Sequence, residues 1–211
     1  MNIAKIMEIL MALFGKKKEE VKPNDKPTKK AQDIAKKFER KTGKTTKVWK
    51  VGDMISPHFS YDEMTRSQTA ERNNIDNTPK IENVENLIAL CENILEPVRV
   101  HFKKPATVTS GFRCIKLNRK IGSTDRSQHT KGEAADFIIN GSPTVTDVWK
   151  WIIDSDLDFD QVIQEFGRWV HVSYKKDGEN RHICSIAKKV DGKTRYFHYT
   201  EKQIEKGEYE L

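Results

Sequence analysis

The sequence has few apolar residues and few cysteines. Of its 211 residues, 36% are hydrophobic and 33% are charged, whereas about 25% are charged in an average soluble protein. No run reaches the roughly 18 consecutive apolar residues of a transmembrane helix, so we expect none. Three cysteines, an odd and sparse count, argue against a disulfide framework. Internal repeats are also absent, and the length suggests one globular domain with an appended tail.

The positive charge is concentrated near the N-terminus. The formal net charge is +7, yet residues 16–50 carry 14 basic and 5 acidic side chains, and residues 51–211 carry a net −2. A lysine-rich, proline-containing segment buries too little apolar surface to order itself, so we predict a basic disordered linker over residues 16–47. The same arm, over 16–50, could also bind an anionic surface such as nucleic acid or a cell-wall polymer. Nucleic-acid binding is not expected of the folded domain.

The first fifteen residues differ from the linker. Their apolar residues recur at helical spacing, which predicts an amphipathic helix over residues 1–15. Three roles compete for this helix: contact with a membrane surface, docking on a partner such as a virion protein, and an atypical secretion signal. Glu8 interrupts the apolar core that a cleavable signal peptide requires, so a cleaved signal is the least favoured.

Residues 48–211 have the pattern of a folded domain. Ser60 is a candidate N-cap for a short helix, and apolar spacing predicts further helices over 80–101, 117–121 and 145–153. Alternating or apolar runs predict strands over 106–110, 134–139, 159–165, 169–174, 181–188 and 194–199, the last two joined by an Asp-Gly turn. Helices come first and strands cluster later, which indicates an α+β fold with helices packed on a mainly antiparallel sheet.

Three polar residues in this domain are candidates for chemistry. His129 lies in a polar loop, Asp136 in the apolar stretch ADFII, and His171 in the strand WVHVSY. Polar side chains inside apolar strands need buried partners, and Asp136 and His171 converge if their strands are neighbours. Two imidazoles and one carboxylate are a ligand set of catalytic zinc. Taken singly, each residue is more often a satisfied core group or an ion-pair partner.

The spacing of these residues resembles a known family. Ser127-x-His129-x-x-Gly132-x-Ala134-x-Asp136, followed by Trp169-x-His171, is similar to the zinc D-Ala-D-Ala carboxypeptidase-type metallopeptidases, which share a fold with hedgehog and lysostaphin-type proteins. The segment Ser110-Gly111-Phe112-Arg113 extends the resemblance, which covers roughly residues 55–185. The overall pattern resembles the phage and bacterial peptidoglycan peptidases.

The resemblance implies roles for individual residues. The ligands of one Zn²⁺ ion would be His129, Asp136 and His171. Arg113 would face the substrate and stabilise the transition state, and Ser127 and Trp169 would contact the substrate peptide. Many relatives place the general base, a glutamate, three residues before the second histidine, where this chain has Arg168. Glu165 is then the nearest candidate base, with Asp160 as an alternative.

The implied activity is hydrolysis of peptidoglycan stem peptides by a zinc-dependent DD-carboxypeptidase or endopeptidase. An endolysin-like phage enzyme, either a lysis enzyme or a virion component, would act on the bacterial cell wall. The departure at Arg168 keeps open a non-catalytic zinc-binding module that binds the cell wall or serves in a virion. A second alternative is nucleic-acid binding through the 16–50 arm.

Overall fold

The computed structural model describes residues 48–141 and 143–210, and Lys50–Leu211 form one compact unit. The predicted amphipathic helix over 1–15 and the predicted linker over 16–47 lie outside the described residues. Among the helices of the described part, none combines the length and apolar character needed to cross a membrane.

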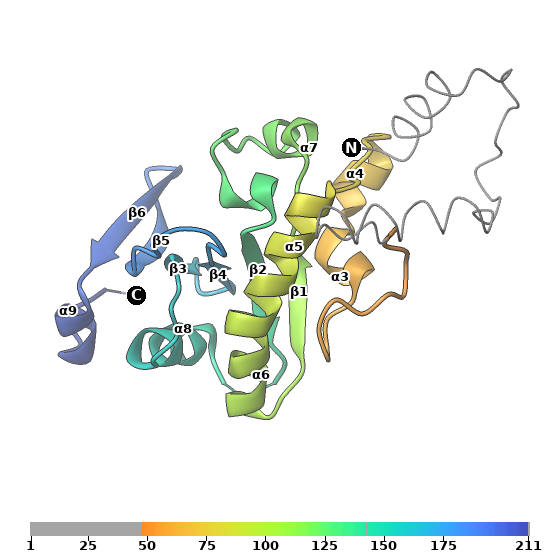
Figure 1. Ribbon diagram of the computed structural model, residues 1–211. Coiled ribbons are helices and arrows are strands. Elements are labelled where there is room, and N and C mark those ends of the chain that lie inside the picture. Colours follow the sequence, from red (N-terminus) through yellow and green to blue (C-terminus); the bar gives the residue numbers. More distant parts are fainter. Residues whose placement is uncertain (1–47, 142, 211) are drawn as a thin grey trace, which may run out of the picture. The chain divides into compact units, whose positions relative to one another are not determined.

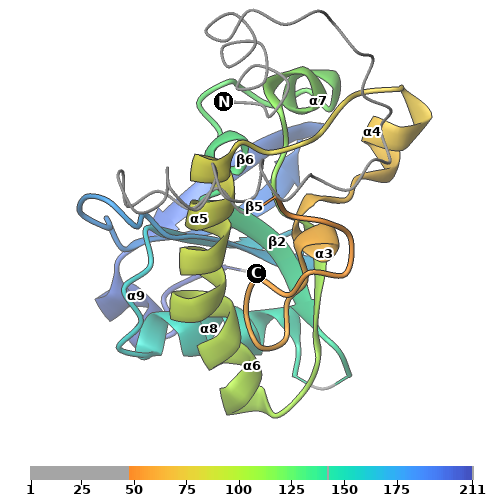
Figure 2. The ribbon, with the colours of Figure 1, turned by 45° about the vertical axis from the view of Figure 1, so that its right-hand side comes forward.

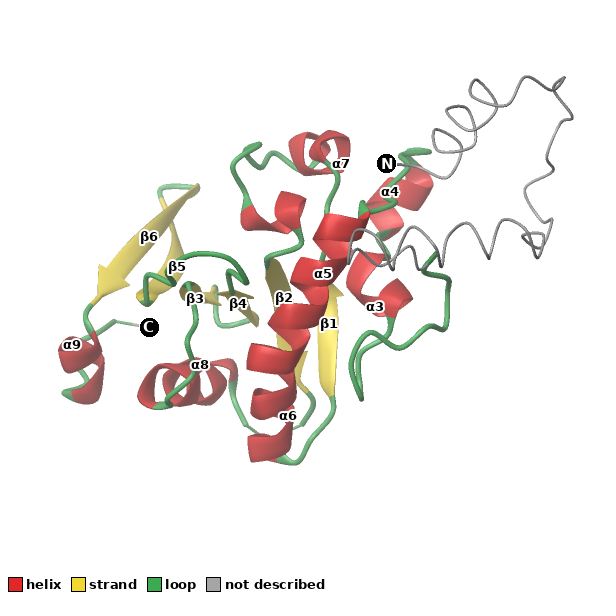
Figure 3. Ribbon diagram, in the orientation of Figure 1, coloured by secondary structure: helices red, strands yellow, loops and turns green. Residues whose placement is uncertain are grey.

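A six-stranded sheet forms the centre of the unit (Figure 3). Its strand order is β1-β2-β4-β3-β5-β6. The strands are β1 Ala106–Ser110, β2 Ala134–Ile139, β3 Gln161–Glu165, β4 Trp169–Ser173, β5 Ile183–Val190 and β6 Lys193–Tyr199. Four of the five pairings are antiparallel, and β3 pairs with β5 in parallel. The predicted α+β class is confirmed, and the sheet is mixed.

The hairpin β5–β6 closes where the sequence predicted, but its first strand begins later than expected. Asp191 and Gly192 both have positive φ, 50° and 73°, which is typical of the two-residue turns that match strand twist. Arg181 and His182 were predicted to be in the strand. Instead Arg181 binds the buried Asp160 carboxylate, and His182 adopts φ 53°, so the ladder starts at Ile183.

One long helical segment lies beside β1 and β2 in both views of the ribbon (Figures 1 and 2). It consists of α5 Ile81–Leu90, a π-helical turn η1 Cys91–Leu95, and α6 Glu96–Phe102. Pro97 lies inside the predicted 80–101 helix, and a proline in a helix interior usually kinks or ends the helix because it cannot donate an intrahelical hydrogen bond. The segment continues past Pro97, which stands in the first turn of α6 directly after the wider π turn.

The remaining helices are short, apart from α8. They are α3 Tyr61–Thr65, α4 Gln68–Arg72, α7 Ile115–Lys120, the 3₁₀ turn η2 Gln128–Lys131, α8 Val145–Asp154 and α9 Glu201–Glu205. Ser60 caps α3 as predicted, since its hydroxyl accepts from the Glu63 amide at 3.2 Å. The elements α4, η2 and α9 were not anticipated, because four or five residues carry too little periodicity to detect.

Helix α8 defines the two faces of the sheet. The Gln164 amide donates to the Thr146 hydroxyl of α8 at 3.2 Å, so Gln164 points toward this helix. Side chains alternate along a strand, so Glu165 points to the opposite face. On α8 itself Trp149 is fully buried, whereas Trp151 is half-buried and stacks on His101.

Candidate metal centre

Two of the predicted ligands are direct partners across the sheet. In the antiparallel pair β2–β4, Asp136 stands opposite His171. Opposed side chains point to one face, and here Asp136 Oδ1 lies 2.8 Å from His171 Nδ1. Asp136 is 7% exposed and His171 is 8% exposed, so this polar pair is almost removed from solvent at the middle of the sheet.

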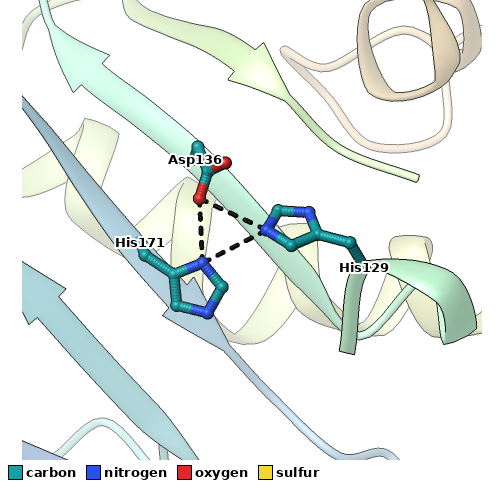
Figure 4. Close-up of side chains that lie close together, drawn as sticks. All are labelled: His129, Asp136 and His171. Carbon is teal, nitrogen blue, oxygen red and sulfur yellow. Dashed lines mark hydrogen bonds and ion pairs between the residues drawn. The ribbon is translucent and has the colours of Figure 1, made fainter. Parts of the chain in front are cut away.

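The third predicted ligand reaches the pair from the loop before β2. His129, on η2, places Nε2 3.2 Å from His171 Nδ1 and 3.3 Å from Asp136 Oδ1 (Figure 4). Its other ring nitrogen, Nδ1, donates to the Gly111 carbonyl oxygen at 2.7 Å. Because a carbonyl can only accept, Nδ1 carries the proton, and a neutral His129 turns the Nε2 lone pair toward the cluster.

Burial and neighbouring charges favour the protonation states of His129 and Asp136 that bind a metal ion. Burial lowers the pKa of His129, and the attraction of the Asp136 charge only partly offsets this effect. Burial alone would raise the pKa of Asp136, but the Coulombic and hydrogen-bond interactions with His129 and His171 hold it well below its usual range. A neutral imidazole and an ionised carboxylate are the forms that ligate a metal ion.

The spacing of the three donor atoms suits a tetrahedral ion. Bonds of about 2.0–2.2 Å at tetrahedral angles separate neighbouring ligand atoms by about 3.4 Å. The three separations here are 2.8, 3.2 and 3.3 Å. The cluster of His129, Asp136 and His171 therefore fits a zinc ion with small outward shifts, and a fourth position is left for water or substrate.

Arg113 lies beside the metal centre rather than in open solvent. Its Nη2 pairs with Asp136 Oδ2, and its Nε donates to the Ser110 hydroxyl at 2.7 Å. The guanidinium therefore fixes the carboxylate through the oxygen that does not face the histidines. A guanidinium has five N–H donors, so it retains donors for a substrate, which is the role that the family resemblance implies.

Glu165 occupies the end of β3 on the same face as the ligands. Ile163 pairs with His171 and Glu165 with Trp169, so Glu165 and His171 stand in adjacent rows of one face. Burial raises the pKa of Glu165, and the nearby negative charge of Asp136 raises it further. Interactions with His171 and Arg113 oppose this rise in the pKa of Glu165.

Arg168, the position at which the sequence departs from the family pattern, lies in a turn. Residues 166–168 form the tight turn between β3 and β4, and the Arg168 amide donates to the Glu165 carbonyl at 2.9 Å. Arg168 is exposed, whereas Glu165 directly precedes the turn and is half-buried. Within residues 48–141 and 143–210, Glu165 forms no ion pair with Arg168 or Arg113.

The other predicted site residues are placed as follows. Trp169 lies on the ligand face opposite Glu165, with its ring 5.7 Å from that of Phe166. Ser127 precedes η2, and its carbonyl accepts from the Thr130 amide at 3.0 Å and hydroxyl at 2.7 Å, which shapes the loop that carries His129. Asp160, the alternative base, is fully buried and bound to Lys175 and Arg181, away from this chemistry.

Two glycines allow the backbone to close around the centre. A Cβ at Gly111 would lie 2.2 Å from the Met64 carbonyl oxygen, and one at Gly132 would lie 2.3 Å from that of Asn83. Gly132 also has φ +78°, a conformation that L side chains rarely adopt. Sequence reasoning assigned no role to the Gly111 carbonyl, because a backbone acceptor leaves no signal in residue identity.

The fold and this donor set define a class of protein: an α+β chain with a buried His-Asp-His cluster that could hold a metal ion. The family model described as Peptidase M15 matches residues 57–173, more than half of the chain. The chain belongs to the Peptidase M15 family, whose members are zinc-dependent metallopeptidases. A comparison with curated proteins found no match.

Proposed function

We propose that this protein is a zinc peptidase that hydrolyses peptidoglycan stem peptides, with His129, Asp136 and His171 as the zinc ligands. The observation that carries the proposal is the convergence of these three donors within a matched M15 segment. Zinc bound there would act as a Lewis acid and would lower the pKa of coordinated water to about 7. The cut would be made as a DD-carboxypeptidase or an endopeptidase.

Glu165 and Arg113 would have different roles in the reaction. Glu165, on the ligand face and partly accessible, takes the proton from the attacking water and passes it to the leaving amine. Burial and the charge of Asp136 raise the pKa of Glu165, which brings it closer to neutral pH and favours such proton exchange. Arg113 holds Asp136 in place and uses its remaining donors to stabilise negative charge that develops on the substrate oxygen.

The assay that tests the proposal is release of new amino groups from purified peptidoglycan by the zinc-loaded protein. We expect Glu165→Gln to lower turnover by about 10²–10⁴-fold, the usual contribution of a general base, while zinc content stays near one ion per chain. Glu71→Gln, at an exposed position on α4, is the matched control and should retain full turnover.

Metal content separates the ligand assignment from the catalytic one. His129→Ala and His171→Ala should each lose most of the bound zinc at micromolar free metal, because removing one of three protein ligands opens the site. Zinc binding without amine release by the wild-type protein would favour the non-catalytic cell-wall module. Stoichiometric zinc in both histidine variants would refute the ligand assignment.

An endolysin-like role in a phage, in lysis or in the virion, and action at the bacterial cell wall remain part of this proposal. The resemblance of the sequence pattern to phage and bacterial peptidoglycan peptidases supports both. Lysis of bacteria by protein applied from outside or expressed inside the cell would test the lytic role.

A further inference from the structure

The hairpin β5–β6 extends the ligand face beyond the segment that the family model matches. The match ends at residue 173, and the hairpin begins at Ile183. Because β5 pairs with β3, the sheet continues from the metal centre to β6 at its edge (Figure 1). Side chains of the hairpin that share the face of His129, Asp136 and His171 therefore lie outside the matched segment.

Tyr196 stands in the same row as the candidate base. The register places Glu165 beside Ala187 of β5, and Ala187 beside Tyr196 of β6. Neighbouring strands are about 4.8 Å apart, and Ala187 has only a methyl group between the two longer side chains. The ring of Tyr196 is half-exposed, and its hydroxyl has no hydrogen-bond partner within residues 48–141 and 143–210.

The charge of the centre reaches Tyr196. Burial raises the pKa of the phenol, and the negative charges of Glu165 and Asp136 raise it further. These interactions agree with a ring that leans inward over Ala187 rather than away from the edge of the sheet. A phenol in this position remains protonated at neutral pH and is available as a hydrogen-bond donor.

A cation lies next to Tyr196 on the same face. Lys189 of β5 pairs with Thr194 of β6, two residues along from the Ala187–Tyr196 pair, so it shares their face. Its Nζ lies 5.5 Å from the centre of the ring of Phe166, the residue that follows Glu165 in the sequence. The same Nζ donates to the Thr194 hydroxyl at 2.9 Å. Lys189 thus carries positive charge at the rim of a centre whose own carboxylates would repel an anion.

We propose that Tyr196 and Lys189 form a subsite that binds a carboxylate of the substrate peptide on the β6 side of Glu165, an inference that rests on the proposed peptidase function. Arg113 lies on the β1 side of the metal centre, and this subsite lies on the β5–β6 side. A peptide lying across the sheet would then be held at both ends. A hydroxyl and an ammonium suit a carboxylate because each donates a hydrogen bond and the ammonium neutralises its charge.

The test uses two pairs of stem peptides, and the members of each pair differ only in having a carboxylate or a carboxamide at one position. In the first pair this position is the C-terminus, and in the second pair it is the α-carboxyl group of the D-glutamate. We expect the wild-type protein to prefer the acid of one pair about tenfold in kcat/KM. Lys189→Met and Tyr196→Phe should each remove most of that preference through a higher KM, with zinc content unchanged. Lys193→Met and Tyr199→Phe, on the opposite face of the hairpin, are the matched controls and should keep it.

The outcomes separate this inference from the proposed function. If the wild-type protein cleaves none of the peptides, the peptidase proposal fails. If it cleaves acids and amides equally, or if both variants retain the preference, the peptidase proposal stands and the subsite is refuted. A lower kcat with an unchanged KM in Tyr196→Phe would also refute it, because the phenol would then serve Glu165 rather than the substrate.

Discussion

Replacement of the buried Asp160 by asparagine should destabilise the domain in a pH-dependent way. Asp160 is fully buried, and its carboxylate binds Lys175 Nζ at 2.8 Å and Arg181 Nη2 at 2.5 Å. Burial alone would raise the pKa of Asp160, but these hydrogen bonds and charges lower it from 3.8 to about 2. The folded state therefore favours the charged carboxylate more than the unfolded chain does.

The size of the effect follows from this shift. A shift of that extent corresponds to about 2 kcal/mol of stability at neutral pH. Arg181 is half exposed, so solvent screening reduces the expected loss in Asp160→Asn to about 1–2 kcal/mol. For a domain of this size we expect Tm to fall by roughly 3–6 °C at pH 7.

The sign of the pH dependence is the sharper test. A carboxylate with a depressed folded pKa stabilises the protein fully above its unfolded pKa, and the stabilisation disappears as pH falls through the folded pKa. The difference between wild type and variant should therefore be nearly constant from pH 7 to pH 5, shrink below about pH 4, and vanish only below the folded pKa, near pH 1.

Urea unfolding of the metal-free protein at several pH values measures this difference. Asp177→Asn, at a side chain that is 89% exposed and 3.9 Å from Lys176, is the control and should change stability by less than about 0.5 kcal/mol. A difference for Asp160→Asn that is the same at pH 7 and pH 3 would show that the loss comes from packing rather than from charge.

Three further predictions concern packing and reactivity. Gly132→Ala, which places a methyl 2.3 Å from a backbone oxygen, should cost at least about 3 kcal/mol in urea unfolding, whereas Gly122→Ala, at similar φ in open space, should cost about 1 kcal/mol. Trp149→Ala should lose about 3–5 kcal/mol because the ring is fully buried, and the half-buried Trp151→Ala less than half of that; equal losses would contradict the burial assignment. Cys91 and Cys184 are buried, whereas Cys114 is a partly exposed residue, so a thiol reagent should modify one cysteine quickly in the native protein, and a Cys114→Ser variant should abolish that fast phase.

Much of the site could be predicted because the alternation of residue types along a strand indicates which side chains share a face. In the strand around His171 the polar residues alternate with Val170 and Val172, and both valines are buried. A slip of one residue in the β2–β4 register would send Asp136 and His171 to opposite faces. The observed pairing is the one that the alternation favours.

Features that depend on distant backbone could not be predicted. The parallel pairing of β3 with β5 joins strands separated by β4 and a loop, and no local pattern specifies it. The partner of His129 Nδ1 is the Gly111 carbonyl, an acceptor that every residue type carries. No sequence pattern relates Tyr196 to Glu165, because the two residues are neighbours only through the register of two strand pairs.

The order of the three proposed zinc ligands along the chain has a consequence for biosynthesis. His129 and Asp136 leave the ribosome well before His171, whose strand must first pair with β2. A nascent chain from which only His129 and Asp136 have emerged offers a metal ion two ligands instead of three. We therefore expect tight metal binding only after β4 has paired with β2. Bound zinc would thus stabilise the pairing of β2 with β4 late in folding, and zinc retention would indicate that this pairing is complete.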